Sequence, residues 1–302
     1  MQGKLLVVGS LNMDLVVSVA LHPQIGETIL GGKFDTIPGG KGANQAVAAA
    51  RMGASVIMIG RVGQDGFGDE LRASAVKDGI DIQYVGVDKQ QATGVALITV
   101  DARGQNTIVV ASGANHTLTP QDLHSAKAAF AMADVMVTQL ESPLETVREA
   151  LTLAEKYKLQ VVLNPAPAQL LDAELLSKVD FFIPNEREAM QVAGADTLET
   201  AIEKLLGMGV RNLIITLGEK GVLVVTADGC KQIPAYLVQA VDTVAAGDAF
   251  VGAFATGISE NLGVDAAVRL GNAAAAISVT RHGAQPSLPR REEVNEFLGD
   301  QK

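Results

Sequence analysis

Val135-Met136-Val137 and Val161-Val162-Leu163 are two short apolar runs, and a segment with a helical pattern, from Pro143 to Tyr157, separates them. Short apolar runs bounded by polar residues are typical of strands that are buried on both faces. A strand, a helix and a second strand in this order form a unit in which the two strands run parallel. These residues therefore predict a parallel sheet with helices on its faces.

The same alternation continues on both sides of this unit. Strands are expected at Leu5–Val8, Ser55–Ile59, Phe181–Ile183 and Leu213–Thr216, and helices at about Gly68–Lys77, Glu186–Val192, Leu198–Leu206, Ala266–Thr280 and Arg291–Leu298. Several such units along one chain predict an α/β fold with a mostly parallel central sheet flanked by helices on both faces.

Two regions interrupt this alternation, because they contain strand-like runs without helices between them. The runs are Leu15–Ala20, Thr28–Ile37, Thr93–Val100 and Thr107–Ala111, and Asp101–Asn106 is expected to form the turn between the last two. Such strands cannot bury both faces inside a parallel core, so we expect a small β-sheet lid that also serves as an oligomer contact. The expected division is a catalytic domain of residues 1–14, 38–91 and 112–302 and a lid of residues 15–37 and 92–111.

Composition excludes several classes of protein. The 302 residues are 48% hydrophobic, too many for a disordered chain, yet they contain no apolar run long enough to span a membrane. The formal net charge of −10 argues against a nucleic-acid partner. The single cysteine, Cys230, and an N-terminus without a signal-peptide layout predict a cytoplasmic protein, and the four histidines show no metal-ligand spacing.

The segment from Asp242 to Asp248 places a carboxylate where an apolar helix begins. Small residues before that helix allow a ligand to approach the backbone, and the free N–H groups of the first turn attract anions. An aspartate there would repel an anion, unless Asp248 accepts a proton from a hydroxyl while the amides stabilise a transferred group. This pattern indicates phosphoryl transfer, and the alternative is an aspartate that caps the helix.

A second informative segment, Pro38 to Ala46, is rich in glycine and leads into another helix of small residues. Its glycines permit close approach to the backbone, and Lys41 and Asn44 add a charge and an amide within one helical turn. No Ser or Thr follows the Gly-Lys pair, and the chain has no complete G-x-G-x-x-G, so both common nucleotide fingerprints are absent.

Eight segments together resemble the ribokinase-like family of carbohydrate kinases. They occur in the family's order, span nearly the whole chain, and are Gly9–Asp14, Gly39–Ala46, Gln139–Pro143, Asn164–Ala168, Pro184–Glu188, Thr216–Gly221, Asp242–Asp248 and Gly283–Ser287. The resemblance implies ATP-dependent phosphorylation of D-ribose at its primary hydroxyl, with magnesium-ATP as the phosphoryl donor.

The resemblance also implies which residues contact the sugar. Hydrogen bonds to its hydroxyls would come from Asn12, Asp14, Gly39, Gly40, Lys41, Asn44 and Glu141. Carboxylates and amides suit a diol, which offers donors and acceptors at fixed spacing. The alternatives are local turns at Asn12 and Asp14, a solvated Lys41 and a capping or surface role for Glu141.

For the nucleotide, the resemblance implies Asn185, Thr216, Leu217, Gly218, Glu219, Lys220, Gly221 and Asn272, with Glu188 holding magnesium through water. Asn185 and Glu188 also have the spacing of a capping box, and both roles are compatible. Residues Thr216–Gly221 taken alone would be a hairpin turn.

Asp248 would be the base, and the backbone N–H groups of Ala245, Ala246 and Gly247 would form the anion hole. The broad family usually has glycine where this chain has Ala245. Potassium would be held beside the anion hole, largely by backbone carbonyls, at Asp242, Val244, Ser278, Arg281, Gly283 and Ser287.

These residues leave more than one candidate for the sugar substrate. A carboxylate that reaches the 2- and 3-hydroxyls favours ribose, but kinases for 2-deoxyribose and other small sugars share much of this motif set. A sugar-binding regulator without turnover is a further alternative, disfavoured by the presence of Asp248. A nicotinamide dehydrogenase is disfavoured by the missing glycine fingerprint. We expect a homodimer formed through the lid strands.

Overall fold

The computed structural model describes residues 3–227 and 229–300 and contains two β-sheets. The large sheet has the order β13-β12-β11-β10-β9-β8-β1-β4-β5. Its strands are β1 (Lys4–Val8), β4 (Ser55–Gly63), β5 (Asp81–Asp88), β8 (Val135–Thr138), β9 (Gln160–Leu163), β10 (Phe181–Phe182), β11 (Asn212–Thr216), β12 (Val222–Thr226) and β13 (Gly229–Ile233). Among the described strands of this sheet, only the pairs β11–β12 and β12–β13, at one edge, are antiparallel, so the expected mostly parallel sheet is confirmed.

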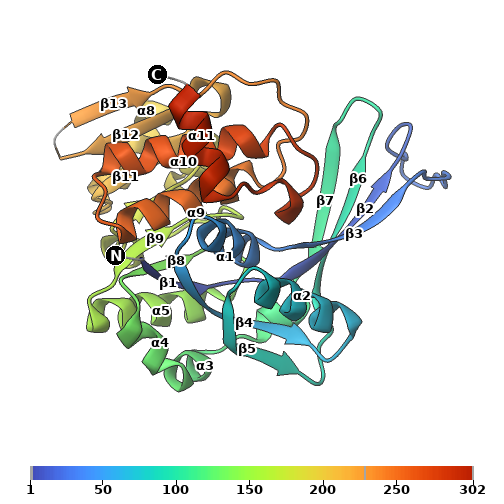
Figure 1. The fold of residues 1–302 in the computed structure, drawn as a ribbon, viewed down its shortest axis with the longest axis horizontal. Coiled ribbons are helices and arrows are strands. Elements are labelled where there is room, and N and C mark those ends of the chain that lie inside the picture. Colours follow the sequence, from blue (N-terminus) through green and yellow to red (C-terminus); the bar gives the residue numbers. More distant parts are fainter. Residues whose placement is uncertain (1–2, 228, 301–302) are drawn as a thin grey trace.

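Helices cover both faces of the large sheet (Figure 1). On β1, Leu5 and Val7 belong to one apolar cluster and Leu6 and Val8 to the other, as the two-residue period of a strand requires. The first cluster includes residues of α1 (Lys41–Arg51), α2 (Gly66–Lys77), α9 (Ala246–Ser259), α10 (Val264–Ser278) and α11 (Arg291–Asp300). The second includes residues of α3 (Pro120–Ser125), α4 (Lys127–Met132), α5 (Leu144–Tyr157), α6 (Ala173–Ser177), α7 (Glu186–Ala193) and α8 (Leu198–Gly207).

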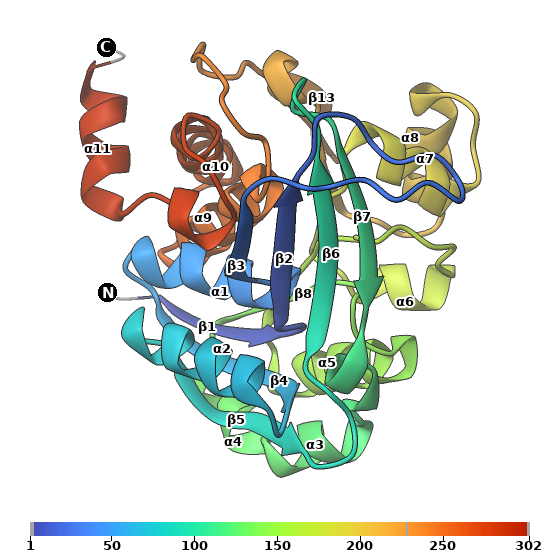
Figure 2. The same ribbon diagram turned by 90° about the vertical axis from the view of Figure 1, so that its right-hand side faces the viewer.

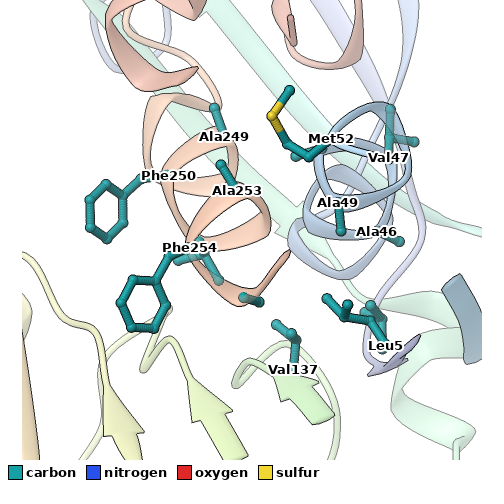
Figure 3. Packing of buried hydrophobic residues seen from close by; sticks show 14 of the residues in the cluster. Leu5, Ala46, Val47, Ala49, Met52, Val137, Ala249, Phe250, Ala253 and Phe254 are labelled. Atoms are coloured by element: carbon teal, nitrogen blue, oxygen red, sulfur yellow. The ribbon is translucent and has the colours of Figure 1, made fainter. Parts of the chain in front are cut away.

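Helices α1 and α9 lie side by side over the sheet, as Figure 3 shows for Ala46, Ala49 and Ala253. A Cβ atom added at Gly252 would be 2.5 Å from the Ala48 Cβ and 2.7 Å from the Gln45 carbonyl oxygen, so only glycine allows this approach. The consequence is that the first turns of both helices adjoin at the same end of the pair.

The small sheet has the order β3-β2-β6-β7 and stands beside the large sheet (Figures 1 and 2). Its strands are β2 (Asn12–Ser18), β3 (Phe34–Gly39), β6 (Gly94–Val100) and β7 (Asn106–Ala111). Strands β2 and β6 pair parallel, whereas β2–β3 and β6–β7 pair antiparallel. The expectation of a small separate sheet is confirmed, including the hairpin turn between its last two strands.

Several expected boundaries were wrong. Residues 28–33 lie outside any strand, because Gly31 and Gly32 have low strand propensity and only Gly32 N–H and the Lys33 carbonyl bond to Ser18. Strand β2 begins at Asn12, earlier than the expected Leu15. The sequence-based prediction also omitted the strands β5, β12 and β13. In the part of the chain that the structure describes, no helix has the length and apolar character needed to cross a bilayer.

Candidate active site

The predicted site residues gather where the parallel strands of the large sheet end. Glu141 follows β8, Asn164 follows β9, Asn185 follows β10, and Thr216 is the last residue of β11. Ligands of open α/β sheets bind outside the carboxyl ends of the strands, because the loops there converge on one crevice. The topology therefore brings together polar residues that are far apart in the sequence.

Asp248 lies in the first turn of α9, and its carboxylate is buried between two amides of α1. The Asn44 Nδ2 donates to its Oδ2 at 3.0 Å, and the Gln45 Nε2 donates to its Oδ1 at 2.9 Å. Burial raises the pKa of Asp248, although the Lys41 charge and the two amide donors act in the opposite direction. Ala245, not Asp248, occupies the capping position of α9, so the interpretation of Asp248 as a helix cap is wrong.

The turn before α9 is formed by an alanine in a glycine-like conformation. Ala245 has φ of 60°, in the left-handed region that disfavours side chains. The Ala246 N–H donates to the Thr243 carbonyl over a long 3.3 Å. The first N–H groups of a helix have no carbonyl one turn before them, which leaves this end of α9 able to bind an anion.

Glu141 lies at the start of α1. Its Oε2 accepts hydrogen bonds from the Ser10 hydroxyl at 2.5 Å, from the Lys41 N–H at 3.1 Å and from the Asn12 Nδ2 at 3.4 Å. The Asn12 Oδ1 in turn accepts from the Asn115 Nδ2 at 2.7 Å. A local turn at Asn12 and a surface role for Glu141 are therefore wrong, since both side chains bond across the site. The alternative of a capping role for Glu141 is supported, because it accepts from the N–H of Lys41, the first residue of α1.

Asp14, on β2, is a buried carboxyl group with a strongly raised pKa. Burial, together with the charges of Glu141 and Asp248, raises its pKa to about 7, although Lys41 acts to lower it. Burial alone would lower the pKa of Lys41, but the surrounding carboxylates outweigh burial and raise it. Lys41 is thus a half-buried, charged group surrounded by carboxylates, and the interpretation of a solvated lysine is wrong.

Two glycines before α1 leave room for these groups. A Cβ atom at Gly39 would be 2.4 Å from the Asp14 Oδ2. Gly40 has φ of 86°, and a Cβ there would be 2.6 Å from the Asn12 backbone nitrogen. Any side chain at either position would displace the polar residues of β2.

Two cavities meet at Asp248. The larger, of about 790 Å³, is lined by Ala96, Ile98, Ile108 and Val110 of the small sheet and by the predicted sugar-binding residues Asn12, Asp14, Gly40, Lys41, Asn44 and Glu141. The smaller, of about 210 Å³, is lined by Asn185, Glu188, Thr216 and Gly247 among others. Four residues line both cavities: Lys41, Thr243, Ala245 and Asp248. Their shared wall is a place where a group could pass from a ligand in one cavity to a ligand in the other.

Asn185 and Glu188 form the capping box that their spacing indicated. The Glu188 N–H donates to the Asn185 Oδ1 at 2.8 Å, and the Asn185 N–H donates to the Glu188 Oε2 at 2.9 Å. Burial raises the pKa of Glu188, partly offset by the hydrogen bond from Asn185 and by Lys41. Both residues also face the smaller cavity, so the structural role does not exclude the binding one.

The other predicted nucleotide residues line neither cavity. Leu217–Gly221 connect β11 to β12 through a short 3₁₀ turn, Gly218–Lys220, as a hairpin would. The Asn272 Nδ2 donates to the Pro234 carbonyl at 3.1 Å.

The predicted potassium residues form two groups of three, each joined by hydrogen bonds. The Asp242 carboxylate accepts from the Val244 N–H and from the Gly283 N–H, each at 2.9 Å. The hydroxyls of Ser278 and Ser287 are 2.8 Å apart. The Arg281 N–H bonds to the Ser278 carbonyl at 3.0 Å, and the Arg281 guanidinium pairs with Glu293.

Sequence reasoning missed five residues that organise this site: Ser10, Gln45, Asn115, Gln139 and Asn164. Four of them are buried, and Asn164 is half-buried. The signal for Gln45 was available, because it is a polar residue among the alanines and valine of a packed helix. Asn115 lies in a 3₁₀ turn with no motif around it, and nothing local marks its role.

Comparison with known proteins agrees with this geometry. Residues 2–291 match the family model described as pfkB family carbohydrate kinase. The chain is 44% identical to the ribokinase of Haemophilus influenzae, with 99% of each chain covered, and 41% identical to the deoxyribokinase of Salmonella typhimurium, with 97% of each covered. The solved structure of Arabidopsis thaliana ribokinase complexed with ribose and ATP has a TM-score of 0.90 at 30% identity, with 99% of each chain covered. The resemblance inferred from the eight sequence segments is confirmed.

Proposed function

Because the chain belongs to the pfkB family of carbohydrate kinases, we propose that it transfers the γ-phosphoryl group of ATP to the primary hydroxyl of D-ribose, giving ribose 5-phosphate. The observation that carries this proposal is the position of Asp248, whose side chain lies at the wall shared by the two cavities. The larger cavity would hold the sugar, and the smaller one the phosphates. The names of the relatives support ribose and ATP as the substrates.

Asp248 would accept the proton of the primary hydroxyl as that oxygen attacks the γ-phosphorus. The raised pKa of Asp248 makes it a stronger base than an ordinary carboxylate, and its two amide donors hold it in one orientation. The Asn44 Oδ1 is buried without a hydrogen-bond partner among the described residues, so a sugar hydroxyl would satisfy it.

Charge that develops on the transferred group would be stabilised from two sides. The N–H groups of Ala246 and Gly247 belong to the first turn of α9, and that of Ala245 lies at its capping position, where the helix dipole favours anions. Lys41 lines both cavities and stays protonated because carboxylates surround it. Positioning and charge stabilisation are the main sources of rate enhancement in phosphoryl transfer.

Magnesium would neutralise charge on the phosphates of ATP. Glu188 would hold it through water, with Asn185 beside it. The chemistry fits, because Glu188 is half-buried and forms no ion pair with any Lys, Arg or His in residues 3–227 and 229–300. A cation there would compensate the carboxylate that burial disfavours.

Potassium would order the segment that presents the amides of the anion hole. Asp242, Val244, Ser278, Arg281, Gly283 and Ser287 would hold it, mostly through carbonyl oxygens. Asp242 suits a cation because its carboxylate joins the Val244 and Gly283 loops through N–H donors and, among the residues described, has no ion-pair partner. Equal rates with and without potassium would contradict this part of the proposal.

The deoxyribokinase of Salmonella typhimurium supports 2-deoxyribose as a second candidate sugar. The two candidates differ in the 2-hydroxyl, and Asp14 is the carboxyl group with which a 2- or 3-hydroxyl would pair. A buried polar group left unpaired discriminates strongly against the analogue that lacks its partner.

The small sheet would serve as a lid and as the contact of a homodimer. Residues 15–37 and 92–111 would form this lid, and the remaining segments the catalytic domain. Alternate residues of β6 and β7 face the larger cavity, which leaves Leu97 and Val109 paired on the opposite face, 51% and 65% exposed. An exposed apolar sheet face is typical of a surface that a second chain covers.

The test is release of ADP from magnesium-ATP with D-ribose, 2-deoxy-D-ribose, D-fructose or adenosine, each with and without potassium. We expect rapid turnover of ribose that increases with potassium. Preference for another sugar would keep the mechanism and replace the substrate. Binding of ribose without turnover of any sugar would favour a regulator.

A further inference from the structure

We infer that Gln45 is a positioning residue for Asp248, and that it is oriented by a relay of side-chain amides that starts at a backbone carbonyl of the large sheet. The inference rests on the proposed function in that Asp248 is taken as the base. It concerns a residue that contacts neither cavity.

The relay begins at Ile183, the residue that follows β10, and has a fixed direction. The Asn164 Nδ2 donates to the Ile183 carbonyl at 2.9 Å. A backbone carbonyl can only accept, so this bond directs the Asn164 Oδ1 toward Gln45. The Gln45 Nε2 then donates to that Oδ1 at 3.2 Å and, with its second hydrogen, to the Asp248 Oδ1 at 2.9 Å.

A second contact is consistent with this orientation of Gln45. The Gln139 Nε2 donates to the Gln45 Oε1 at 2.6 Å. Rotation of the Gln45 amide by 180° would place its oxygen against both the Asp248 carboxylate and the Asn164 oxygen, and its nitrogen against the Gln139 nitrogen. Gln139 has room because Gly9 lacks a side chain, as a Cβ there would be 2.1 Å from the Gln139 Oε1. The orientation of the Gln45 amide is therefore set by Asn164, which is itself oriented by a backbone carbonyl, and by the Asp248 carboxylate.

Gln45 and Asn44 are neighbours with different roles. Asn44 binds the other oxygen of Asp248 and lines the larger cavity, where it can also touch a sugar. Gln45 is fully buried, with an exposed fraction of 0%. A change at Gln45 can therefore reach the reaction only through its partners, Asp248 and Asn164, whereas a change at Asn44 acts on both the base and the sugar.

The hydrogen bond from Gln45 favours the charged form of Asp248 and lowers its pKa. Four other charges face the same carboxyl group: Lys41 from α1 lowers its pKa, while Glu141 after β8, Asp14 on β2 and Glu188 on α7 interact with it as like charges. Gln45 and Asn44 are the two buried neutral donors to Asp248. Without Gln45, Asp248 would need a higher pH to become the carboxylate.

The first test is the steady-state kinetics of Gln45→Met, which keeps the length of the side chain and removes its polar atoms. We expect kcat to fall roughly 10- to 100-fold and KM for the sugar to change less than about threefold, the loss of one hydrogen bond to a charged group. The acid limb of the pH profile should move up by roughly one pH unit. Gln45→Glu, which places a second acid beside Asp248, should move it further.

Thr256→Val is the matched control, since Thr256 is a buried polar residue of α9 whose hydroxyl bonds to the Gly252 carbonyl at 2.9 Å. We expect this variant to lose some stability and to keep the wild-type pH profile. Gln45→Met combined with Asp248→Asn should lower the residual rate by less than about threefold, because residues that act through one another are not additive.

A second readout does not depend on turnover. The carboxyl ¹³C resonance of Asp248, assigned by its absence in Asp248→Asn, should titrate at higher pH in Gln45→Met and higher still in Gln45→Glu than in the wild type. An unchanged titration of Asp248 in folded Gln45→Glu would overturn the inference. So would a Gln45→Met variant in which KM for the sugar rises while kcat stays at the wild-type value. Failure of wild-type protein to phosphorylate any sugar would overturn the proposed function and leave this titration to decide the role of Gln45.

Discussion

The two walls of the larger cavity differ in how their acids are held. On the wall formed by the large sheet and its helices, Asp248 and Glu141 accept hydrogen bonds from side-chain or backbone donors. On the wall formed by the small sheet, no group among residues 3–227 and 229–300 donates to the Asp14 carboxylate, which is nevertheless buried. The large sheet therefore supplies groups that are organised before a ligand arrives, whereas Asp14 is a group that a ligand would complete.

The largest effect should come from the organised wall. Asp248→Asn keeps the shape of the side chain and removes the base, so we expect kcat to fall roughly 10²- to 10⁴-fold, the range for loss of a general base. Sugar affinity should change far less, because Asn44 and Glu141 remain in place. Steady-state kinetics together with sugar binding by calorimetry would check this. A near-normal kcat in the folded variant would mean that Asp248, on the wall formed by the large sheet, is not the base.

Asp14→Asn should act on binding and on stability. Removal of the partner for the sugar hydroxyls should raise sugar KM by about 10- to 100-fold, as expected for one buried polar contact. The folded-state pKa of Asp14 is about 7 and its ordinary value 3.8, so between these values the folded protein holds a proton that the unfolded chain has released. Stability from this group is therefore lost as pH rises from about 4 to 7.

At pH 8 we accordingly expect Asp14→Asn to be more stable than the wild type, with a free energy of unfolding larger by an amount on the order of 2 kcal/mol. At pH 4 the two proteins should differ little. Urea unfolding at both pH values would measure the difference. Equal stability at pH 8 would show that the acid on the small sheet is as well satisfied as those on the other wall.

The outer face of the small sheet should control assembly without direct contact with the cavity. Val109→Asp places a charge in the exposed apolar pair of Leu97 and Val109, and we expect the dimer dissociation constant to rise at least about tenfold. Sedimentation over a concentration series would measure it. Leu206→Asp, at a leucine of α8 that is 39% exposed, is the control and should leave assembly unchanged. A wild-type protein that is monomeric at all concentrations would remove this role from the small sheet.

The smallest effect should come from the turn before α9. Ala245→Gly relieves a left-handed conformation that costs an alanine about 1 kcal/mol, but glycine also raises the conformational entropy of the unfolded chain. We therefore expect the free energy of unfolding to increase by about 0.5 kcal/mol. Thermal unfolding would detect the increase, and Ala275→Gly, inside α10, should instead lower the free energy of unfolding by about 1 kcal/mol. A loss at Ala245 equal to that at Ala275 would mean that the turn is not strained.

Prediction from the sequence succeeded where the signal was local. The strand of Val135–Val137 and the helix that follows were recognised from their apolar periods, and Asp248 from its place at the start of a helix. The strand predicted over residues 28–33 was wrong, because a β-like composition around Gly31 and Gly32 does not form a strand without a paired neighbour. Asn272 and Leu217–Gly221 were assigned by resemblance alone, and the structure places them outside both cavities.

The sequence by itself determined the α/β alternation, the interruption by a second sheet and the helix start that carries the base, because each depends on residues close together in the chain. Only the tertiary structure decided what each side chain bonds to. Gln45 and Asp248 are 203 residues apart, and Glu141 and Lys41 are 100 apart. Hydrogen bonds and pKa shifts depend on distances of a few ångströms and on burial, and folding sets both by packing α1 against α9 over the carboxyl ends of the sheet.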